Sequence, residues 1–477
     1  MTRNNYEAVI GLEIHVELTT ASKMFCSCGT GFGAPPNTQC CPVCMGFPGT
    51  LPVPNGEAVR KTALAGLALG CKIAEVSRFA RKNYFYPDLP KAYQISQDES
   101  PLCVCGGIEI TGDDGLPKRV GITRIHLEED AGKLIHENGG TYVDFNRCGI
   151  PLAEIVTEPD LRSAAETSRF VKKLRSRLVY AGISDCKMNE GSLRCDVNIS
   201  VRKKGEKTLG VRAEIKNINS FRFMEEAIEY EYTRQAELLE SGGRVELETR
   251  RYDENTGKTY SMRPKESRAD YRFFDEPDIG DIVLAESEIE ALRLSLPEFP
   301  DIRERHYLAA GISSEDAAVI LGERRFSDFF DEALTFVGGG GSTSGFSKFY
   351  TASLSFIFAG EKGTSCIAAE HFAEIYRMQS DGKISAGAAK KLTKLCAESG
   401  EEPCAVAERE DMYMITDRDE ILRFVEEAFA RSSKAVSDFK NGKTSAAKSI
   451  VGLAMSLSGG KIDPKTAAEL VEEKLKA

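Results

Sequence analysis

The periodicity of apolar residues changes once along this chain, near residue 289, and the change limits the folds it can adopt. Residues 1–292 form many short segments in which apolar and polar residues alternate, broken by Gly, Pro and Asn, as is typical of β-strands. Three stretches in this part instead have helical spacing, namely Glu57–Leu69, Ala164–Ala181 and Phe223–Leu239. The pattern therefore predicts a mixed α+β domain.

After the change, apolar residues follow helical periods to the end of the chain, so the second part is expected to be mostly α-helical. A length of 477 residues also exceeds what one compact core holds, which indicates two or three domains. The domains are predicted at 1–292, 293–400 and 401–477. A glycine-rich stretch, Val337–Phe346, is predicted to be a loop or hinge between helices.

Charge and hydropathy indicate where such a chain works and what it binds. No apolar stretch typical of a secretory signal occurs near the N-terminus, and no run reaches the roughly eighteen apolar residues of a membrane span. We therefore expect a cytoplasmic protein without a membrane segment. A net charge of −11 argues against nucleic-acid binding by the whole surface. Residues 431–477 could still bind phosphates, because they contain nine Lys or Arg and five Asp or Glu.

Ionisable residues recur on one face of several predicted strands. In AVIGLEIHVEL, residues 8–18, the apolar side chains share one face and Glu13, His15 and Glu17 share the other. Four later segments repeat the pattern, with Glu128 and Glu129, then Glu154 and Glu158, then Arg194, Asp196 and Arg202, then Arg212, Glu214 and Lys216. Carboxylates lining a curved sheet can hold Mg²⁺, and interleaved cations can neutralise a transferring phosphoryl group. Surface ion pairs are the alternative interpretation.

Two close cysteine pairs are separated by a loop rich in Gly and Pro. They are Cys26 with Cys28 and Cys41 with Cys44, the second pair forming a C-x-x-C knuckle. Four thiolates saturate a tetrahedral zinc ion and leave no catalytic position, so residues 26–44 are predicted to form a structural zinc site. Cys40 is then the spare cysteine. Redox chemistry is the alternative, and the lack of a following βαβ pattern disfavours it.

The stretch 78–97 mixes cations with aromatic residues. The cations are Arg78, Arg81, Lys82 and Lys91, and the aromatic residues are Tyr84, Phe85, Tyr86 and Tyr93. Cations beside aromatic rings can hold phosphates and stack a nucleobase. Aromatic residues in such a stretch just as often fill a core, so the composition alone leaves both interpretations open.

Longer strings of residues point to a known family. They are VIGLEIHVEL, RKNYFYPDLPKAYQISQ, GITRIHLEEDAGK, GIPLAEIVTEPDLRS, MNEGSLRCDVNISVR, AEIKNINSF, ETRRYDENTGKTYSMRPKES and DYRFFDEPDI. With these strings the chain resembles, nearly end to end, the B subunit of tRNA-dependent amidotransferases, the GatB/GatE family. The resemblance is weaker around residues 337–366. The segment NGKTSAAKSIVGLAMSLSGGKIDPK resembles the YqeY pattern.

The resemblance implies a fold and an activity. The fold would be a glutamine-synthetase-like cradle with a mixed or antiparallel sheet, an all-α domain and a small α-helical YqeY-like tail. In the activity it implies, Mg²⁺ and ATP phosphorylate the side-chain carboxylate of Glu-tRNA(Gln) or Asp-tRNA(Asn), and ammonia displaces the phosphate. The ammonia would come from glutamine in a GatA-like amidase subunit, and a small GatC-like subunit would complete a heterotrimer.

The resemblance also implies roles for individual residues. Its Mg²⁺ ligands match His15, Glu128 and Glu154 best, with Glu13 and Glu214 as nearby candidates. By their charge, Arg194 or Arg212 is expected to stabilise the transferred phosphoryl group. Contacts to the nucleotide are expected from Lys82, Tyr84, Lys91, Arg212 and Lys216. The family's zinc knuckle matches Cys26, Cys28, Cys41 and Cys44. The YqeY-like tail implies contact with the outer corner of tRNA, for which the candidates are Lys440, Lys443 and Lys448.

Two other functions are compatible with the sequence. One is a non-catalytic adaptor that binds tRNA and zinc, and the other is a stand-alone glutamine-synthetase-like ligase that uses free ammonia. Five carboxylate-bearing strands argue against the adaptor, because binding RNA phosphates does not require them. The basic tail argues against a ligase of small substrates.

Overall fold

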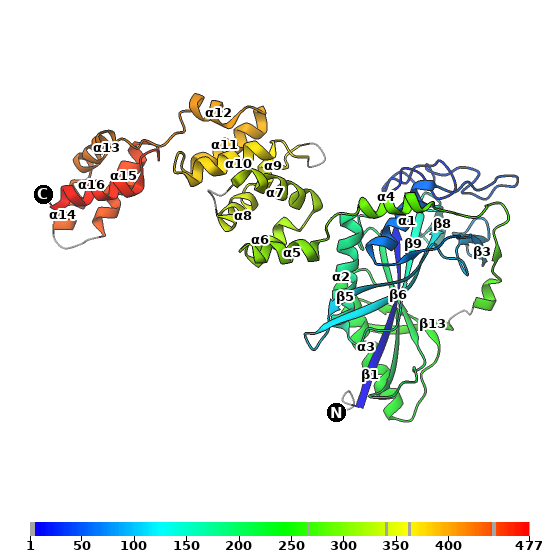
Figure 1. Cartoon of the computed structure of the whole chain (residues 1–477). Helices are drawn as coiled ribbons and strands as arrows, with labels where there is room; N and C mark the ends of the chain where they lie inside the picture. Colours follow the sequence, from blue (N-terminus) through cyan, green and yellow to red (C-terminus); the bar gives the residue numbers. More distant parts are fainter. Residues whose placement is uncertain (1–4, 265–267, 339–341, 361–363, 441–444, 477) are drawn as a thin grey trace. The chain divides into compact units, whose positions relative to one another are not determined.

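The computed structural model divides into two compact units, Met1–Pro300 and Asp301–Ala477 (Figure 1). It describes residues 5–264, 268–338, 342–360, 364–440 and 445–476. The first unit contains strands and helices and the second is helical, which confirms the α+β class. None of the helices in these described ranges combines the length and apolar character that a membrane crossing requires.

A nine-stranded sheet forms the centre of the first unit (Figure 1). Its strands are β1 (Tyr6–Glu17), β2 (Lys72–Ile73), β5 (Cys103–Thr111), β6 (Pro117–Glu129), β9 (Pro151–Thr157), β10 (Leu193–Lys203), β11 (Ala213–Lys216), β12 (Glu248–Asp253) and β13 (Lys258–Pro264). Their order is β13-β12-β11-β10-β1-β9-β6-β5-β2. Neighbouring strands are antiparallel except β11 and β12, so the sheet is mixed, as expected. The five segments predicted to carry ionisable residues are five adjacent strands, from β11 to β6.

Three helices pack their apolar side chains against one face of this sheet. They are α1 (Gly56–Ala68), α2 (Ala164–Tyr180) and α3 (Phe221–Glu240), close to the three predicted ranges. Asn55, Ser163 and Ser220 precede them, and each side chain accepts hydrogen bonds from backbone N–H groups of the first turn. Side chains alternate along β1, so Ile14 is buried in this core while Glu13 and His15 lie on the other face.

Smaller elements complete the first unit. A three-stranded sheet, in the order β14-β3-β4, joins β3 (Ala80–Asn83), β4 (Tyr93–Ser96) and β14 (Phe274–Asp275). A hairpin joins β7 (Lys133–Glu137) to β8 (Gly140–Asp144), and α4 (Glu286–Leu294) packs on α1. Gln94 Nε2 donates to the Glu129 carbonyl at 2.7 Å, and Glu129 Oε1 accepts from the Ile95 N–H at 3.0 Å. These bonds fix the small sheet beside the end of β6.

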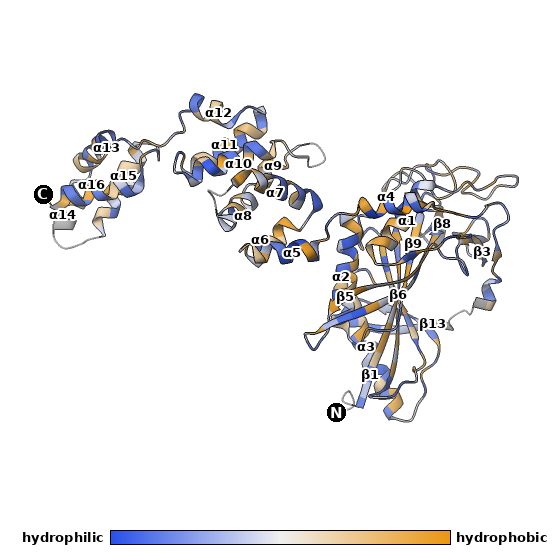
Figure 2. Cartoon of the chain, viewed as in Figure 1, coloured by the Kyte–Doolittle hydropathy of each residue, from blue (hydrophilic) through white to orange (hydrophobic). Residues whose placement is uncertain are grey.

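The second unit contains two separate hydrophobic clusters. The first joins α5 (Pro300–Ala309), α6 (Ser314–Ile320), α7 (Arg324–Val337), α8 (Thr343–Thr351), α9 (Leu354–Ile357), α10 (Ala369–Ser380), α11 (Ala386–Ser399) and α12 (Pro403–Arg409). The second joins α13 (Arg418–Arg431), α14 (Ser433–Lys440), α15 (Ala446–Leu457) and α16 (Pro464–Lys476). Figure 2 shows polar and apolar residues interleaved along these helices, as amphipathic helices around a shared core require. Val406 and Ala407 of α12 belong to the first cluster, so the boundary predicted near residue 400 falls inside it.

The glycine-rich stretch joins α7 to α8. Gly338 has a φ of 67°, in the left-handed region that favours glycine, and it ends α7. Residues 339–341 lie outside the described residues. The predicted loop extended to Phe346, but α8 already begins at Thr343, because the Ser342 side chain caps the helix by accepting from the Gly345 N–H.

Candidate active site

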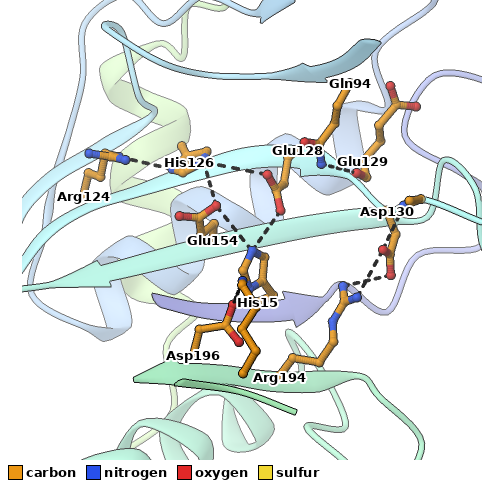
Figure 3. Close-up of polar contacts among 12 residues, drawn as sticks. His15, Gln94, Arg124, His126, Glu128, Glu129, Asp130, Glu154, Arg194 and Asp196 are labelled. Carbon is orange, nitrogen blue, oxygen red and sulfur yellow. Dashed lines mark hydrogen bonds and ion pairs between the residues drawn. The ribbon is translucent and has the colours of Figure 1, made fainter. Parts of the chain in front are cut away.

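Strand pairing collects a polar cluster on the face of the large sheet that the helices leave uncovered (Figure 3). Strand β9 lies between β1 and β6, and Glu154 pairs in register with His15 on one side and His126 on the other. Glu128 follows His126 by two residues, so it points to the same face. The sheet thus brings together four ionisable side chains from three strands that are far apart in the sequence.

The side chains of this cluster converge closely. His15 Nε2 lies 3.4 Å from Glu128 Oε1 and 3.4 Å from Glu154 Oε2. His126 Nε2 lies 3.3 Å from Glu154 Oε2. One ligand atom each from His15, Glu128 and Glu154 lies within 4.8 Å of the other two, a spacing suited to a shared metal ion. The structure therefore brings together the three residues predicted as Mg²⁺ ligands.

The electrostatics of the cluster favour a positive charge at its centre. Burial alone would lower the pKa of His15, but the hydrogen bond with Glu154 and the two nearby carboxylates outweigh it and raise the pKa to about 9. Burial and the charge of Glu154 raise the pKa of Glu128. Burial acts in the same direction on Glu154, but His126 and His15 hold its pKa well below the ordinary value. The charge can be a proton on His15 or a metal cation that replaces it.

A second carboxylate cluster lies on the neighbouring strands. Glu13 of β1 and Asp196 of β10 are opposite in register, and Glu214 of β11 joins them with oxygen atoms all within 4.8 Å. Lys216 Nζ lies 2.5 Å from Asp196 Oδ2 and 3.6 Å from Glu214 Oε1. Thr249 Oγ1 donates to Glu214 Oε2 at 2.8 Å, which fixes one oxygen of that carboxylate.

Two pockets of about 360 Å³ each contain these clusters, and both have His15, Lys82 and Lys216 in their walls. The first is also lined by Glu13, Ser96, Gln97, Asp98, Arg124, His126, Glu154, Arg212, Glu214, Thr249, Tyr271 and Phe273. The second is also lined by Tyr84, Gln94, Glu128, Asp130, Ala131, Leu152, Arg194, Asp196 and Asn217. Cavities of this size accommodate small ligands, and the mixed charges suit a polyanion together with a cation.

Arg194 is oriented within the second pocket by a buried carboxylate. It pairs in register with His15, and its two terminal nitrogens donate to Asp130, at 2.9 Å to Oδ2 and 3.3 Å to Oδ1 (Figure 3). Arg147 Nε lies 3.5 Å from the same carboxylate. Of the predicted catalytic and nucleotide contacts, Lys82, Tyr84, Arg194, Arg212 and Lys216 all line the two pockets.

Lys91 is the exception among these predicted contacts. Its side chain is 9% exposed, forms an ion pair with Glu129, and lines a smaller cavity of about 110 Å³ together with Cys26 and Cys44. Burial would lower the pKa of Lys91, but the Glu129 carboxylate raises it above its ordinary value. Side chains alternate along β6, so Glu129 points to the opposite face from Glu128. Lys91, which is paired with Glu129, lies on that opposite side as well. Lys91 therefore does not line the two larger pockets.

Other predicted residues of the stretch 78–97 are also placed elsewhere. Arg78 and Arg81 form ion pairs with Asp281 and Glu276. Phe85 and Tyr86 are exposed, and Tyr93 lines the smaller cavity with Lys91. Lys82 and Tyr84 alone, of the cations and aromatic residues predicted in this fully described stretch, line the larger pockets.

The two cysteine pairs meet in one cluster. The Sγ atoms of Cys26, Cys28, Cys41 and Cys44 all lie within 4.8 Å of one another, and this set of four thiols fits a closed tetrahedral zinc site. The hydrogen bond with Cys26 lowers the pKa of Cys44 to about 5, against the effect of burial, and Lys23 acts in the same direction. Cys40 lies outside the cluster and donates to the Asn37 carbonyl at 3.2 Å.

Residues 8–290 match the family model described as the GatB/GatE catalytic domain, and residues 360–475 match the model described as the GatB domain. The chain belongs to the GatB/GatE family. The first match contains both carboxylate clusters and the four cysteines, and the second contains the helical tail as far as residue 475.

Relatives in the GatB/GatE family are similar to this chain over its full length. The B subunit of the aspartyl/glutamyl-tRNA(Asn/Gln) amidotransferase of Caldicellulosiruptor saccharolyticus is 47% identical over 480 residues, which cover 98% of this chain and 99% of the relative. The protein of the same name in Caldicellulosiruptor bescii is also 47% identical, with the same coverage. The B subunit numbered 1 of the same amidotransferase in Clostridium acetobutylicum is 44% identical over 476 residues, which cover 98% and 99% of the two chains.

The candidate tRNA contacts lie in the tail of this GatB/GatE chain. Lys448 is exposed on α15, and Lys440 is the last residue of α14. Lys443 lies outside the described residues.

Some residues of the pockets were not predicted. His126 has no informative spacing from any partner in the sequence, and only the strand register identifies Glu154 as its neighbour. Asp196 was noted on the ionisable face of its strand, but alternation alone could not place it beside Glu13. Tyr271 and Phe273 belong to the string DYRFFDEPDI, which has no periodicity that would assign it to a site.

Proposed function

We propose that this chain activates and amidates the side-chain carboxylate of Glu or Asp attached to tRNA, using ATP. The observation that carries the proposal is the convergence of His15, Glu128 and Glu154 beside cationic side chains, in a member of the GatB/GatE family. Relatives named as components of an amidotransferase support the same reaction class.

The chemistry explains why a phosphoryl-transfer site is needed. A carboxylate is a poor acceptor for ammonia because oxide is a very poor leaving group. A carboxylate oxygen of the aminoacyl group therefore attacks the γ-phosphorus of ATP, the bond to the bridging oxygen breaks, and ADP leaves. Ammonia then attacks the acyl carbon, the bond to the phosphoryl oxygen breaks, and phosphate leaves while the nitrogen loses one proton. The product is the amide, still attached to tRNA.

Both carboxylate clusters have donor sets that fit a divalent cation. The first offers two carboxylates and one imidazole, and the second offers three carboxylates. Oxygen ligands suit Mg²⁺. Bound there, Mg²⁺ would neutralise phosphate oxygens of ATP and hold them for transfer. His15 would serve as a ligand in its neutral form, beside Glu128 and Glu154.

The cations of the pockets would act on the charge that moves during the reaction. Arg194, held by Asp130, faces the pocket that contains Glu128, and it stabilises negative charge on the transferred phosphoryl group. Lys82, Arg212 and Lys216 contact other phosphate oxygens. Lys216, now paired with Asp196, exchanges that carboxylate for a phosphate when ATP binds.

Further groups and partners belong to the same proposal. The four clustered cysteines would hold a structural Zn²⁺, and the basic tail would contact tRNA. A GatA-like amidase subunit would release ammonia from glutamine, with a small GatC-like subunit in the assembly. The chain would then be the ligase component of a heterotrimer.

The test is ATP-dependent conversion of Glu-tRNA and Asp-tRNA into their amides. The chain is assayed alone with ammonium, and in the complex with co-expressed partner subunits and glutamine. Amide formation with ammonium, and use of glutamine only with the partners, is the expected result. Binding of tRNA by the complex without phosphoryl transfer or amidation would instead establish a non-catalytic adaptor, the second candidate, which the basic tail supports.

A further inference from the structure

The first of the two large pockets has an aromatic wall in addition to its charged one. Tyr271 and Phe273 line it, and their ring centroids are 6.1 Å apart at an interplanar angle of 67°. Tyr84, in the wall of the adjoining pocket, has its ring centroid 6.1 Å from that of Tyr271. This pocket is therefore lined both by carboxylates and by a pair of neighbouring aromatic rings.

The backbone of the aromatic wall is held in place by the side chain of Asn83 and by strand pairing in the small sheet. Asn83 Nδ2 donates to the Arg272 carbonyl at 2.8 Å and to the Tyr271 carbonyl at 3.4 Å. Strand β14 begins at Phe274 and pairs with β3 directly after the wall. Arg272 has a φ of 45°, a conformation that residues other than glycine rarely adopt. The turn that presents the two rings is thus fixed by the fold.

Lys82 lies beside the aromatic wall and lines both of the large pockets. Its Nζ lies 4.8 Å from the centroid of the Tyr271 ring, within cation–π distance. Lys82 also lines the adjoining pocket, which contains Glu128 and Arg194. A ligand that spans the site would therefore meet an aromatic surface, then a lysine, then carboxylates and arginine. A flat base joined to a chain of phosphates has this sequence of chemistries.

We propose that Tyr271 and Phe273 form the binding surface for an adenine base. The inference rests on the proposed function and identifies the residues that recognise the nucleoside end of the substrate. Adenine reaches this site from ATP or from the 3′-terminal adenosine of the aminoacyl-tRNA. The geometry favours ATP, because the phosphate-binding cations and the carboxylates line the same pocket as the rings.

The test uses the assembled enzyme carrying Tyr271→Leu or Phe273→Leu. Each variant is expected to raise the KM for ATP about tenfold, the loss that removal of one stacking ring produces, with little change in kcat. Inhibition by tripolyphosphate, which has no base, should be unchanged. Phe274→Leu is the matched control, since that neighbouring ring is exposed and lies 5.7 Å from the Arg81 guanidinium, outside the residues that line the pocket.

The outcomes distinguish ATP from the 3′-terminal adenosine as the source of adenine. They also distinguish failure of the adenine surface from failure of the proposed function. A raised KM for aminoacyl-tRNA with an unchanged KM for ATP assigns the rings to the 3′-terminal adenosine. Unchanged KM values for both substrates, in variants with wild-type melting temperatures, overturn the adenine surface. Phe273→Trp should restore binding, because it restores a stacking ring. Calorimetric titration with ATP and Mg²⁺ measures the affinity of each variant for ATP without requiring amidation. A chain that binds ATP through the rings but does not amidate would contradict the proposed function and not the adenine surface.

Discussion

At the scale of single residues, the hydrogen bonds of His126 assign it a role. Arg124 Nε donates to His126 Nδ1 at 3.4 Å, so Nε2 is the nitrogen of the imidazole that is left to donate. That nitrogen faces Glu154 Oε2 at 3.3 Å, the oxygen that His15 also contacts. His126 is therefore a positioning residue that holds Glu154 in place for its contact with His15 and a cation.

We predict that His126→Phe weakens metal binding while keeping a flat aromatic ring at this position. Without the donated proton, Glu154 loses one of the two imidazoles that orient it. The concentration of Mg²⁺ or Mn²⁺ that gives half-maximal amidation should rise about 10- to 100-fold, as for other residues that orient a metal ligand. His136→Phe is the control, because His136 is exposed on β7 and bonds to Thr141. Equal metal dependence in the two variants would contradict the assigned role.

Glu128→Gln should abolish the chemistry without releasing the tRNA. The substitution keeps the shape of the side chain but removes a charge from the group formed with His15 and Glu154. Amidation should fall by about 100-fold or more. The metal cation that would neutralise the transferring phosphoryl group loses one of its carboxylate ligands. The dissociation constant for aminoacyl-tRNA should not change. Glu109→Gln, at an exposed position of β5, should behave as wild type, and unchanged amidation by Glu128→Gln would refute the assignment.

Alternation along strands predicted which side chains share a face, but not which of them meet. Glu154 and Glu158 were equivalent in the sequence, yet the register places Glu154 beside His15, while Glu158 accepts from Thr123 at 2.7 Å. Glu128 and Glu129 were also equivalent, and packing of the small sheet takes Glu129 out of the site. Which of two equivalent carboxylates enters the site depends on the order of strands in the sheet. The sequence of a single strand does not give that order.

At the scale of elements, the cysteine cluster holds together the segment that connects β1 to α1. The Lys23 N–H donates to the Cys28 carbonyl, the Cys41 N–H donates to Cys44 Sγ at 3.1 Å, and Asn55 then caps α1. Between β1 and α1 the described residues form turns and one isolated bridge, and apolar side chains after Phe25, namely Phe32, Phe47, Leu51 and Val53, are exposed. A metal bound by four thiolates would supply the missing stabilisation.

We predict that Cys44→Ser lowers both the zinc content and the stability of the first unit. Loss of one thiolate should remove about one equivalent of zinc, measured by plasma mass spectrometry. The melting temperature should fall by about 5 °C, because a structural metal stabilises the folded state by its binding free energy. Cys40→Ser is the matched control, since Cys40 bonds to the Asn37 carbonyl outside the cluster. Equal zinc content in the two variants would exclude the site.

Elements with several turns or strand periods were predictable, and the shortest were not. Helix α2 has helical spacing over its whole length and a serine cap, so its limits are close to those expected. Strands β2 and β14 have two residues each, too few to show any period, and only pairing with β5 and β3 defines them. Near the predicted boundary at residue 400, the spacing in α12 does not show which cluster the helix joins, and the structure packs its Val406 and Ala407 with the helices that precede it.

At the scale of the whole molecule, the residues that the structure describes form three main hydrophobic clusters that share no residue. The large sheet and its helices form the first, helices from α5 to α12 the second, and the tail from α13 to α16 the third. The tail cluster has its own fully buried residues, among them Ile421, Ile450 and Val471. Removing the tail therefore removes no residue of the other two clusters, so its role can be tested separately from the catalytic chemistry.

A chain that ends at residue 414 should keep its chemistry and lose affinity for tRNA. Its first two clusters are intact, so ATP-dependent amidation with ammonium should continue with an unchanged KM for ATP. The KM for aminoacyl-tRNA should rise about tenfold and depend less on salt, because residues 431–477 supply a net charge of +4 for phosphate contacts. Kinetics at several salt concentrations measure both effects.

Charge reversal in the full-length chain separates electrostatic contact from loss of the folded tail. Lys448→Glu changes an exposed residue of α15 and should raise the KM for aminoacyl-tRNA several-fold at low salt, with a smaller effect at high salt. Lys394→Glu, on exposed α11 surface outside the tail, should have no such effect. If truncation and Lys448→Glu both left tRNA kinetics unchanged, the first unit alone would have to position the aminoacyl end, and the tail would have another role.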